Sequence, residues 1–289
     1  MRNFTFKGLF LAAMFMVLGS LAIQAADDGL IIKQITVKLE KAGTLPDRIG
    51  STKRNKITNL KIIGEINGTD LRVIRYMSNR DTGGKLAILD LSEAKIVRGG
   101  DYYYYDYEEF YTHDNELGTH AFYGCRGLTS LTLPSGLTSI GSWAFTGCSG
   151  LTSLSLPSGV TSIGDGAFFG LSSLTSLSLP SGLTSIGDGT FYGCSGLTSI
   201  YVYAEKMPKL GTNMFGGCDA KKCTVYVPKG TYDDYWLSEF GYFENIVEFE
   251  ATGINNVITS NDAKELSRYS VNGQRLSAPT KGLNIVKYS

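Results

Sequence analysis

The stretch Leu128-Thr-Ser-Leu-Thr-Leu-Pro-Ser-Gly136 is written again, with small changes, from Leu151 and from Leu174, and it begins once more at Leu197. Each copy starts 23 residues after the one before it, and an Ile-Gly pair followed by a Phe lies between successive copies. A fixed period in the twenties with an L-x-x-L-x-L core is typical of a leucine-rich solenoid. One such coil cannot bury its own apolar side, so neighbouring coils stack and share a continuous core.

Apolar and polar residues are ordered within each copy. We expect Leu128, Leu131 and Leu133 to face inward along a short strand, with the Thr and Ser residues between them facing outward. Pro and Gly then end the strand and turn the chain. No helical pattern follows the turn. The sequence therefore predicts a leucine-rich repeat solenoid over residues 117–228, mainly β and built from short parallel strands.

The repeat resembles the 23-residue leucine-rich repeats of the BspA-like surface proteins of the Bacteroidetes. The resemblance covers roughly residues 30–250 and is sharpest over residues 117–200. It implies surface display in a Gram-negative anaerobe. It also implies attachment to host or bacterial partners, such as extracellular-matrix proteins.

Both ends of the solenoid carry the features of caps. Residues 26–97 contain two longer, degenerate repeats at 57–62 and 86–91, and they are expected to form a small α/β N-terminal cap with a helix at 71–77. Parts of this segment also resemble the N-terminal cap of the BspA-like proteins. Residues 229–250 are rich in aromatic side chains at helical spacing and are expected to form a helical C-terminal cap over the open end.

Two flanking segments are assigned to targeting. Residues 1–25 read as a signal peptide, because Arg2 and Lys7 precede the uncharged run from Leu9 to Ile23 and small residues follow. Residues 251–289 read as a linker and a β-hairpin tail with an Asn-Gly turn. The tail resembles the C-terminal sorting domain of secreted Bacteroidetes proteins. It is interpreted as truncated because it lacks their basic final strand.

The predicted location follows from these segments. The run at the N-terminus is short for a membrane span, and no other long apolar stretch occurs, so no membrane span is expected in the mature chain. The protein is expected to be exported, to act at the cell surface or extracellularly (the periplasm remains an alternative) and to be a monomer.

Charge and composition limit the partners. The 27 basic residues balance the 27 acidic ones, which gives no reason to expect nucleic acid as a partner. From 117 to 200 the only charged residues are Arg126, Asp165 and Asp188. A partner on this part of the chain would be held by shape, hydroxyl groups and aromatic side chains.

No catalytic, metal or cofactor pattern stands out. The two histidines, His113 and His120, match no zinc motif, and His120 is expected at the surface. Asp165 and Asp188 each precede a Gly and are interpreted as turn residues, not calcium ligands. We therefore expect neither an enzyme nor a cofactor.

Five cysteines recur with the repeat. Cys125, Cys148, Cys194 and Cys218 share one position of the coil, which Leu171 fills in another copy, so the position is interpreted as a buried apolar one. A bridge between Cys125 and Cys148, or between Cys218 and Cys223, stays an alternative for an exported protein.

An inserted loop is the first candidate contact surface. Residues 98–116 interrupt the repeat and carry tyrosines among acidic residues, and insertions in repeat proteins often lie at the binding face. Tyrosine combines a large contact area with few rotatable bonds. The alternative is that the loop only packs over the junction between cap and solenoid. The candidate residues are Tyr102, Tyr103, Tyr104, Tyr105, Tyr107 and Tyr111.

Two further surfaces follow from the repeat itself. Thr129, Thr132, Thr152 and Thr175 belong to a ladder of outward hydroxyl groups that can bind a partner or simply keep the sheet soluble. Trp143 and Phe169 lie beside the buried Phe of their turns, and they are large enough to form a contact surface if they are exposed together.

These features favour a non-catalytic binding protein, with cell-surface adhesion or protein–protein interaction as its role. The expected partner is a host extracellular-matrix protein or a bacterial surface protein. A carbohydrate-binding accessory protein for glycan capture and a structural envelope component are the alternatives.

Overall fold

The computed structural model describes residues 29–250 and the strands at 265–270, 275–276 and 284–288. The predicted signal peptide (1–25) and most of the predicted linker lie outside the described residues. Within them, no helix has the length and apolar character needed to cross a membrane.

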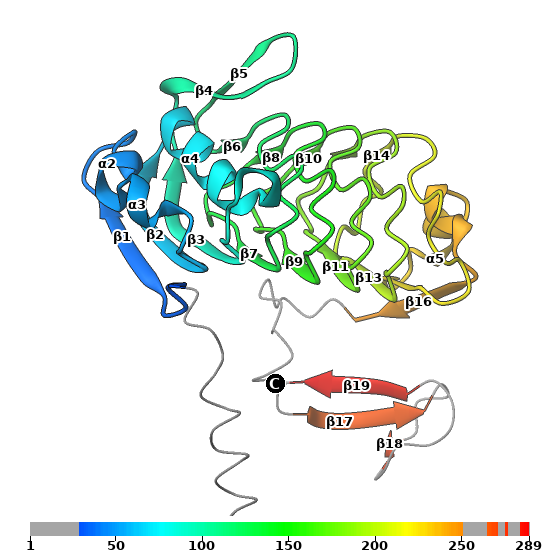
Figure 1. Ribbon diagram of the computed structural model, residues 1–289. Helices are drawn as coiled ribbons and strands as arrows, with labels where there is room; N and C mark the ends of the chain where they lie inside the picture. Colours follow the sequence, from blue (N-terminus) through cyan, green and yellow to red (C-terminus); the bar gives the residue numbers. More distant parts are fainter. Residues whose placement is uncertain (1–28, 251–264, 271–274, 277–283, 289) are drawn as a thin grey trace, which may run out of the picture.

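Residues 29–250 form a leucine-rich solenoid, which confirms the predicted fold class (Figure 1). One wall is a run of parallel strands, seen along the lower edge of the figure. Its members are β1 (Ile35–Leu39), β2 (Asn59–Ile66), β3 (Ile88–Ile96), β7 (Ser130–Thr132), β9 (Ser153–Ser155), β11 (Ser176–Leu179), β13 (Ser199–Val202), β15 (Thr224–Pro228) and β16 (Asn245–Phe249).

The opposite wall is a second parallel sheet of two-residue strands. Three of its strands, at 139–140, 162–163 and 185–186, follow a Pro-Ser-Gly turn, and tight turns stand where other leucine-rich repeats carry a helix. Pairing keeps the repeat register, so that Ile163 lies opposite Ile140 on one side and Ile186 on the other. The members are β6 (Glu116–Leu117), β8 (Ser139–Ile140), β10 (Ser162–Ile163), β12 (Ser185–Ile186) and β14 (Lys209–Leu210).

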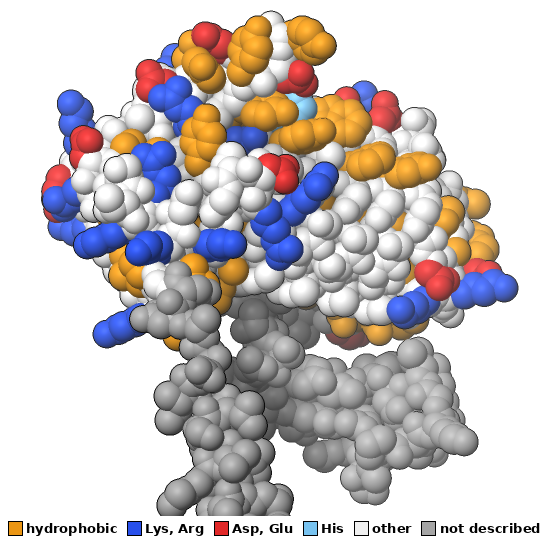
Figure 2. All heavy atoms as spheres, viewed as in Figure 1, with side chains coloured by type: hydrophobic (Ala, Val, Ile, Leu, Met, Phe, Trp, Pro, Cys, Tyr) orange, Lys and Arg blue, Asp and Glu red, His pale blue; other side chains and the backbone are white. Residues whose placement is uncertain are grey.

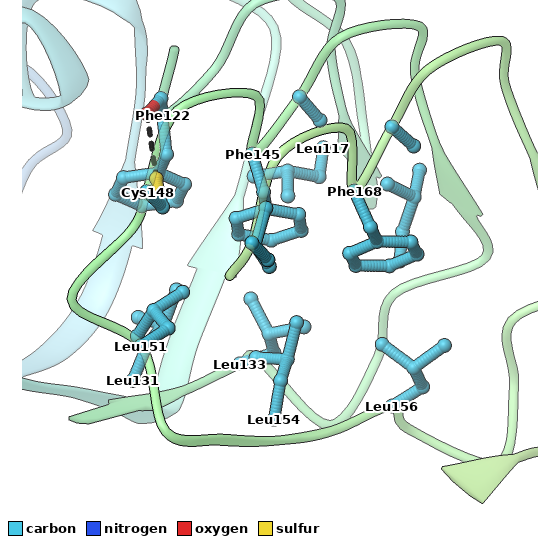
Figure 3. Close-up of a cluster of buried hydrophobic side chains, with 14 of the residues drawn as sticks. Leu117, Phe122, Leu131, Leu133, Phe145, Cys148, Leu151, Leu154, Leu156 and Phe168 are labelled. Atoms are coloured by element: carbon cyan, nitrogen blue, oxygen red, sulfur yellow. Dashed lines mark hydrogen bonds between the residues drawn. The ribbon is translucent and has the colours of Figure 1, made fainter. Parts of the chain in front are cut away.

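A column of stacked phenylalanine rings runs through the core (Figure 3). The rings lie parallel to within 9°, with centroids 5.4 to 5.7 Å apart, and the inward leucines of the first wall pack beneath them. Each coil contributes one ring, so adding a coil extends the buried surface by the same amount. The column consists of Phe122, Phe145, Phe168, Phe191 and Phe215.

The Gly of each Ile-Gly pair is required by the spacing of the coils. A Cβ at Gly164 would lie 2.5 Å from the backbone nitrogen of Ser142 in the preceding coil. Gly141, Gly187 and Gly211 meet the preceding backbone at 2.4 to 2.5 Å in the same way. Any larger residue would push the coils apart, which explains why this pair recurs with the leucines.

The N-terminal cap is built around one buried carboxylate. Helix α4 (Gly68–Ser78) begins with a capping box, in which the Asp70 carboxylate accepts from the Asn67 backbone N–H and the Asn67 side-chain oxygen accepts from the N–H of Thr69. The Asp70 carboxylate accepts hydrogen bonds from the backbone N–H groups of Gly43, Leu45 and Asn67, and its side chain is fully buried. It thereby joins α4 to the start of α2 (Leu45–Ile49). The short helices α3 (Ser51–Arg54) and η1 (Arg80–Thr82) complete this end.

The C-terminal cap is helical only in part. It contains the single-turn helices α5 (Tyr232–Trp236) and η2 (Glu239–Tyr242), but it ends in β16, which pairs in parallel with β15 and extends the first wall. Phe240 and Phe243 close the phenylalanine column, with ring centroids 5.1 and 4.8 Å from that of Phe215. An added strand satisfies the open edge of β15, which a helix alone would leave unpaired.

Three strands follow in the tail. β17 (Glu265–Ser270) pairs antiparallel with both β18 (Arg275–Leu276) and β19 (Asn284–Tyr288), in the order β18-β17-β19.

Candidate functional site

The inserted segment forms a β-hairpin and not an open loop. Strand β4 (Gly99–Tyr105) pairs antiparallel with β5 (Glu109–Thr112), and the hairpin rises from the solenoid beside α4 (Figure 1). At its tip Tyr107 has a left-handed backbone (φ 60°) and is 97% exposed. The insertion therefore presents its tip on two paired strands, so its side chains have defined positions.

Tyr103 does not belong to a contact surface, which corrects the sequence-based assignment. The side chain is only 3% exposed, and its hydroxyl donates a 2.6 Å hydrogen bond to the carbonyl of Thr119. Burial raises the pKa of this phenol well above its usual range. The residue is an anchor for the hairpin, because its buried side chain points back to the body and bonds the first aromatic turn.

Tyr104 and His120 also lie under the hairpin. The Tyr104 ring packs against the rings of Phe110, His120 and Tyr123 at centroid distances of 6.2, 5.0 and 5.7 Å. His120 is half-buried, its Nδ1 has no hydrogen-bond partner, and burial lowers its pKa. The expectation of a surface His120 was wrong, since the hairpin folds over the turn that carries it.

Each aromatic turn of the solenoid depends on its neighbours for hydrogen bonds. Backbone N–H groups of one turn donate to carbonyls of the next, as His120 does to Ser142 and Phe122 does to Ala144. The coil before the first aromatic turn carries helix α4 in place of such a turn, so three carbonyls of the first turn lack these donors. They are the carbonyls of Thr119, Ala121 and Tyr123.

Side chains of the cap and hairpin replace the missing donors. The Tyr103 hydroxyl bonds the Thr119 carbonyl, and the Arg75 guanidinium donates to Ala121 at 2.8 Å and to Tyr123 at 3.3 Å. Arg75 also lies over the Tyr104 ring, 4.4 Å from its centroid. Sequence reasoning missed this role. The repeat register identifies which carbonyls need donors, but it does not show which distant side chains reach them.

Three tyrosines of the hairpin are free to meet a partner. Tyr105, Tyr107 and Tyr111 are 62%, 97% and 45% exposed. Tyr102 is half-buried and carries the Arg72 guanidinium over its ring at 5.3 Å. Of the six candidate tyrosines, the structure thus assigns Tyr103 and Tyr104 to anchoring and leaves the outer three accessible.

The tip of the hairpin is acidic. Asp106, Glu108 and Glu109 are all exposed, and no Lys or Arg in the described residues pairs with them. Asp101, at the base, forms a 2.6 Å ion pair with Arg72. Two cations of the cap, Arg72 and Arg75, are already engaged by groups of this chain.

An aromatic row continues from the hairpin along the solenoid. Tyr123, Trp143 and Tyr192 are 40%, 39% and 38% exposed, with the half-buried Phe169 between the last two. The Trp143 and Phe169 centroids are 6.0 Å apart, and the Phe169 and Tyr192 rings stack at 5.1 Å. Figure 2 shows hydrophobic side chains gathered on the hairpin and across the adjacent coils. Trp143 and Phe169 therefore lie together, with Trp143 exposed and Phe169 half-buried.

The next coils leave room for the Trp143 side chain. Trp143 has a left-handed backbone (φ 56°), and its ring occupies the space that a Cβ at Gly166 would need. We refer to the exposed hairpin tyrosines (105, 107 and 111) and the row Tyr123, Trp143, Phe169 and Tyr192 as the aromatic surface.

The threonine ladder lies on the first wall, away from the hairpin. Thr129, Thr152 and Thr175 flank β7, β9 and β11, and Thr132 is the last residue of β7. The hydroxyls of Thr129 and Thr175 each donate to a carbonyl of the preceding coil at 3.2 Å. The hydroxyl donors of these two threonines are therefore used between coils, which gives them a structural role.

All five cysteines are free and buried. The thiols of Cys148, Cys194 and Cys218 donate to the carbonyls of the stacked phenylalanines in the preceding coils, at 3.0 to 3.4 Å (Figure 3 shows the bond from Cys148). Burial raises the pKa of Cys125 and of Cys218 to about 11 and that of Cys194 to about 12. Neither of the alternative bridges is present.

We expect these thiols to be inert in the folded protein. A disulfide reagent such as Ellman's should label none of them under native conditions and all five after denaturation, because only the exposed thiolate reacts. A Ser135→Cys variant, at an exposed turn position, should add one rapidly reacting thiol. Rapid labelling of the unmodified protein, or fewer than five thiols after unfolding, would contradict the assignment.

No group of three or more His, Cys, Asp or Glu side chains within the described residues is placed to hold a metal ion.

The comparisons with known proteins agree with this picture. A family model described as a BspA type leucine rich repeat region, in six copies, matches residues 115–233. A search of the curated proteins finds no match.

Several solved structures are similar to this chain. A leucine rich repeat protein of T. pallidum is 23% identical, over 66% of this chain and 72% of its own, with a TM-score of 0.41. A leucine-rich repeat protein of Bacteroides ovatus is 20% identical, over 75% and 64%, with a TM-score of 0.35. The pneumococcal vaccine antigen PcpA is 15% identical, over 75% and 56%, with a TM-score of 0.32.

Proposed function

Residues 115–233 belong to the BspA-type leucine-rich repeat region family, and from this premise we propose that the protein works by binding another protein and not by catalysis. The observation that carries the proposal is the aromatic surface. Exposed aromatic side chains of this size are typical of protein contact sites, where Tyr and Trp supply much of the binding energy.

The hairpin is suited to binding because it is already fixed. Tyr103 and Tyr104 hold it to the first coil, and the ion pair of Asp101 with Arg72 holds its base to α4. A partner would therefore not have to order this segment, and the entropy cost of ordering a loop is a large part of what opposes association.

The place of action is part of the same proposal. The basic and then apolar character of residues 1–25 supports export, and the BspA-type repeats support a role at the cell surface or in the extracellular space. A host extracellular-matrix protein or a bacterial surface protein is the expected partner. Adhesion is the role that fits such a partner.

Glycan capture is the second candidate function, and one observation favours it. On the first wall the exposed Ser155 and the buried Ser178 lie in register with Tyr201 and Tyr226, whose rings stack at 4.5 Å. Hydroxyl groups beside aromatic rings can bind a sugar chain. However, these two rings cover each other's faces, which are the parts that a sugar ring would stack on.

The proposal is tested by binding of the mature chain (residues 26–289) to arrayed, purified matrix proteins and glycans. A triple variant, Tyr105→Ser, Tyr107→Ser and Tyr111→Ser, should lose a protein signal that the parent chain gives. The variant should fold normally because all three side chains are exposed.

Matched variants identify the surface that is used. Tyr232→Ser with Trp236→Ser removes exposed aromatics of the C-terminal cap and should leave the protein signal intact. Thr132→Asn with Ser155→Asn alters the first wall. A glycan signal that the first-wall variant abolishes and the hairpin variant retains would overturn the protein-binding proposal in favour of glycan capture.

A further inference from the structure

We infer that the aromatic surface takes an extended protein segment in which Lys or Arg side chains adjoin apolar ones. The basic part would lie on the hairpin and the apolar part along the row from Tyr123 to Tyr192. This inference rests on the proposed function and adds to it the chemistry and the orientation of the partner.

The charge of the hairpin selects a basic segment. Asp106 and Glu108 flank the most exposed tyrosine, and Glu109 follows them. None of the three is paired with a cation of the described chain. An anionic partner would be repelled here, whereas a cationic one gains complementary charge and a faster encounter.

The tyrosine rings at the tip add to the same preference. Tyr107 makes no ring contact with another described side chain, so both of its faces are open to a partner. A Lys or Arg over the open face of a Tyr is attracted to the ring. The chain itself uses this contact twice, with Arg72 over Tyr102 and Arg75 over Tyr104.

The row along the solenoid selects apolar side chains. Neighbouring rings of the row pack against one another, as Trp143 does against Phe169 and Phe169 does against Tyr192. The coils 117–200 beside it carry only Arg126, Asp165 and Asp188 as charged residues. Aliphatic and aromatic side chains of a partner can fill the spaces between such rings without leaving a buried charge unpaired.

The length of the surface sets the length of the segment. Three coil steps separate Tyr123 from Tyr192, which is about 14 Å at about 4.8 Å per step. An extended chain covers this distance with about four or five residues. Further residues would lie on the hairpin, so the segment that matches the whole surface is longer than the part on the row.

A synthetic peptide tests the inference directly. The probe has four Lys and Arg residues followed by five Leu, Val and Phe residues. Binding is followed by Trp143 fluorescence in a mature chain with Trp236→Phe, since these are the only two tryptophans. We expect saturable binding at low salt that shifts the Trp143 emission and weakens as salt rises.

Three comparisons decide the outcome. Asp106→Asn with Glu108→Gln should lower the affinity for the peptide about fivefold or more at low salt and change it little at high salt. Asp233→Asn with Asp234→Asn makes the same change in net charge at exposed positions of the C-terminal cap and should have no effect. Tyr192→Ser should weaken the binding of this peptide. It should not affect the binding of a peptide whose apolar block is replaced by Ser.

The inference is overturned if the peptide does not bind. It is overturned equally if a peptide with Glu in place of Lys and Arg binds as well, or if the two charge variants behave alike. These failures are distinct from failure of the proposed function. Suppose that a matrix protein binds the parent chain but not the hairpin tyrosine variant, and that the peptide does not bind. Protein binding would then stand, and only the inference of a basic–apolar segment would be refuted.

Discussion

Leu154→Asp is expected to unfold the solenoid at ordinary temperature. Leu154 is the central residue of β9, is 4% exposed, and lies in register with Leu177 of the next coil. An unpaired carboxylate at this depth costs several kcal/mol, which is comparable with the whole stability of a typical domain, about 5–15 kcal/mol. Because each coil contacts only its neighbours, damage to a central coil also separates the coils on either side.

The measurement is circular dichroism with thermal and urea melts of the variant and of its parent. Leu154→Met is the matched control, and it should cost less than about 1.5 kcal/mol because volume and polarity are nearly kept. Leu131→Asp, at the equivalent position of the preceding copy and 5% exposed, should behave like Leu154→Asp. A parent-like melting midpoint for either Asp variant would show that the strand does not face the core.

Asp70→Ala is expected to destabilise the N-terminal cap by about 3 kcal/mol or more. The substitution removes the acceptor of three backbone N–H groups, those of Gly43, Leu45 and Asn67. A buried donor left without a partner costs about 1–3 kcal/mol, and loss of a helix cap costs about 1 kcal/mol. The effect should appear in urea melts and as faster hydrogen exchange at the three amides.

Asp47→Ala is the control for this prediction. Asp47 is an exposed carboxylate in the first turn of α2 and accepts no such set of hydrogen bonds. Its removal should cost less than about 1 kcal/mol. If Asp70→Ala and Asp47→Ala were equally mild, the buried carboxylate would not be what joins α2 to α4.

The repeated part of the chain could be predicted well because every copy carries the same constraints. The inward position of Leu131 and the burial of Cys148 both follow from comparing one copy with the next. Repetition tells which positions vary freely and which do not. The same comparison explains the Gly after each second-wall Ile, once the spacing of the coils is known.

The inserted hairpin could not be predicted in this way, because it occurs once. Six tyrosines with the same composition around them received one interpretation, yet Tyr103 is an anchor and Tyr107 is almost fully exposed. Which side chains turn inward depends on the pairing register of β4 with β5 and on the place where the hairpin meets the first coil. His120 was misjudged for the same reason, since what covers it comes from residues 104 and 110.

The sequence by itself determined the solenoid, its direction of growth and the chemical character of its walls, since a 23-residue period of leucine, glycine and phenylalanine permits one way of sharing a core. Only the tertiary structure decided how the solenoid begins and which surface it offers. Arg75 and Tyr103 supply the donors that an earlier coil would have given. The hairpin they hold extends the exposed aromatic row. Such contacts join residues far apart in the chain, and their geometry is set by the packing of the cap against the first coil, which no local pattern encodes.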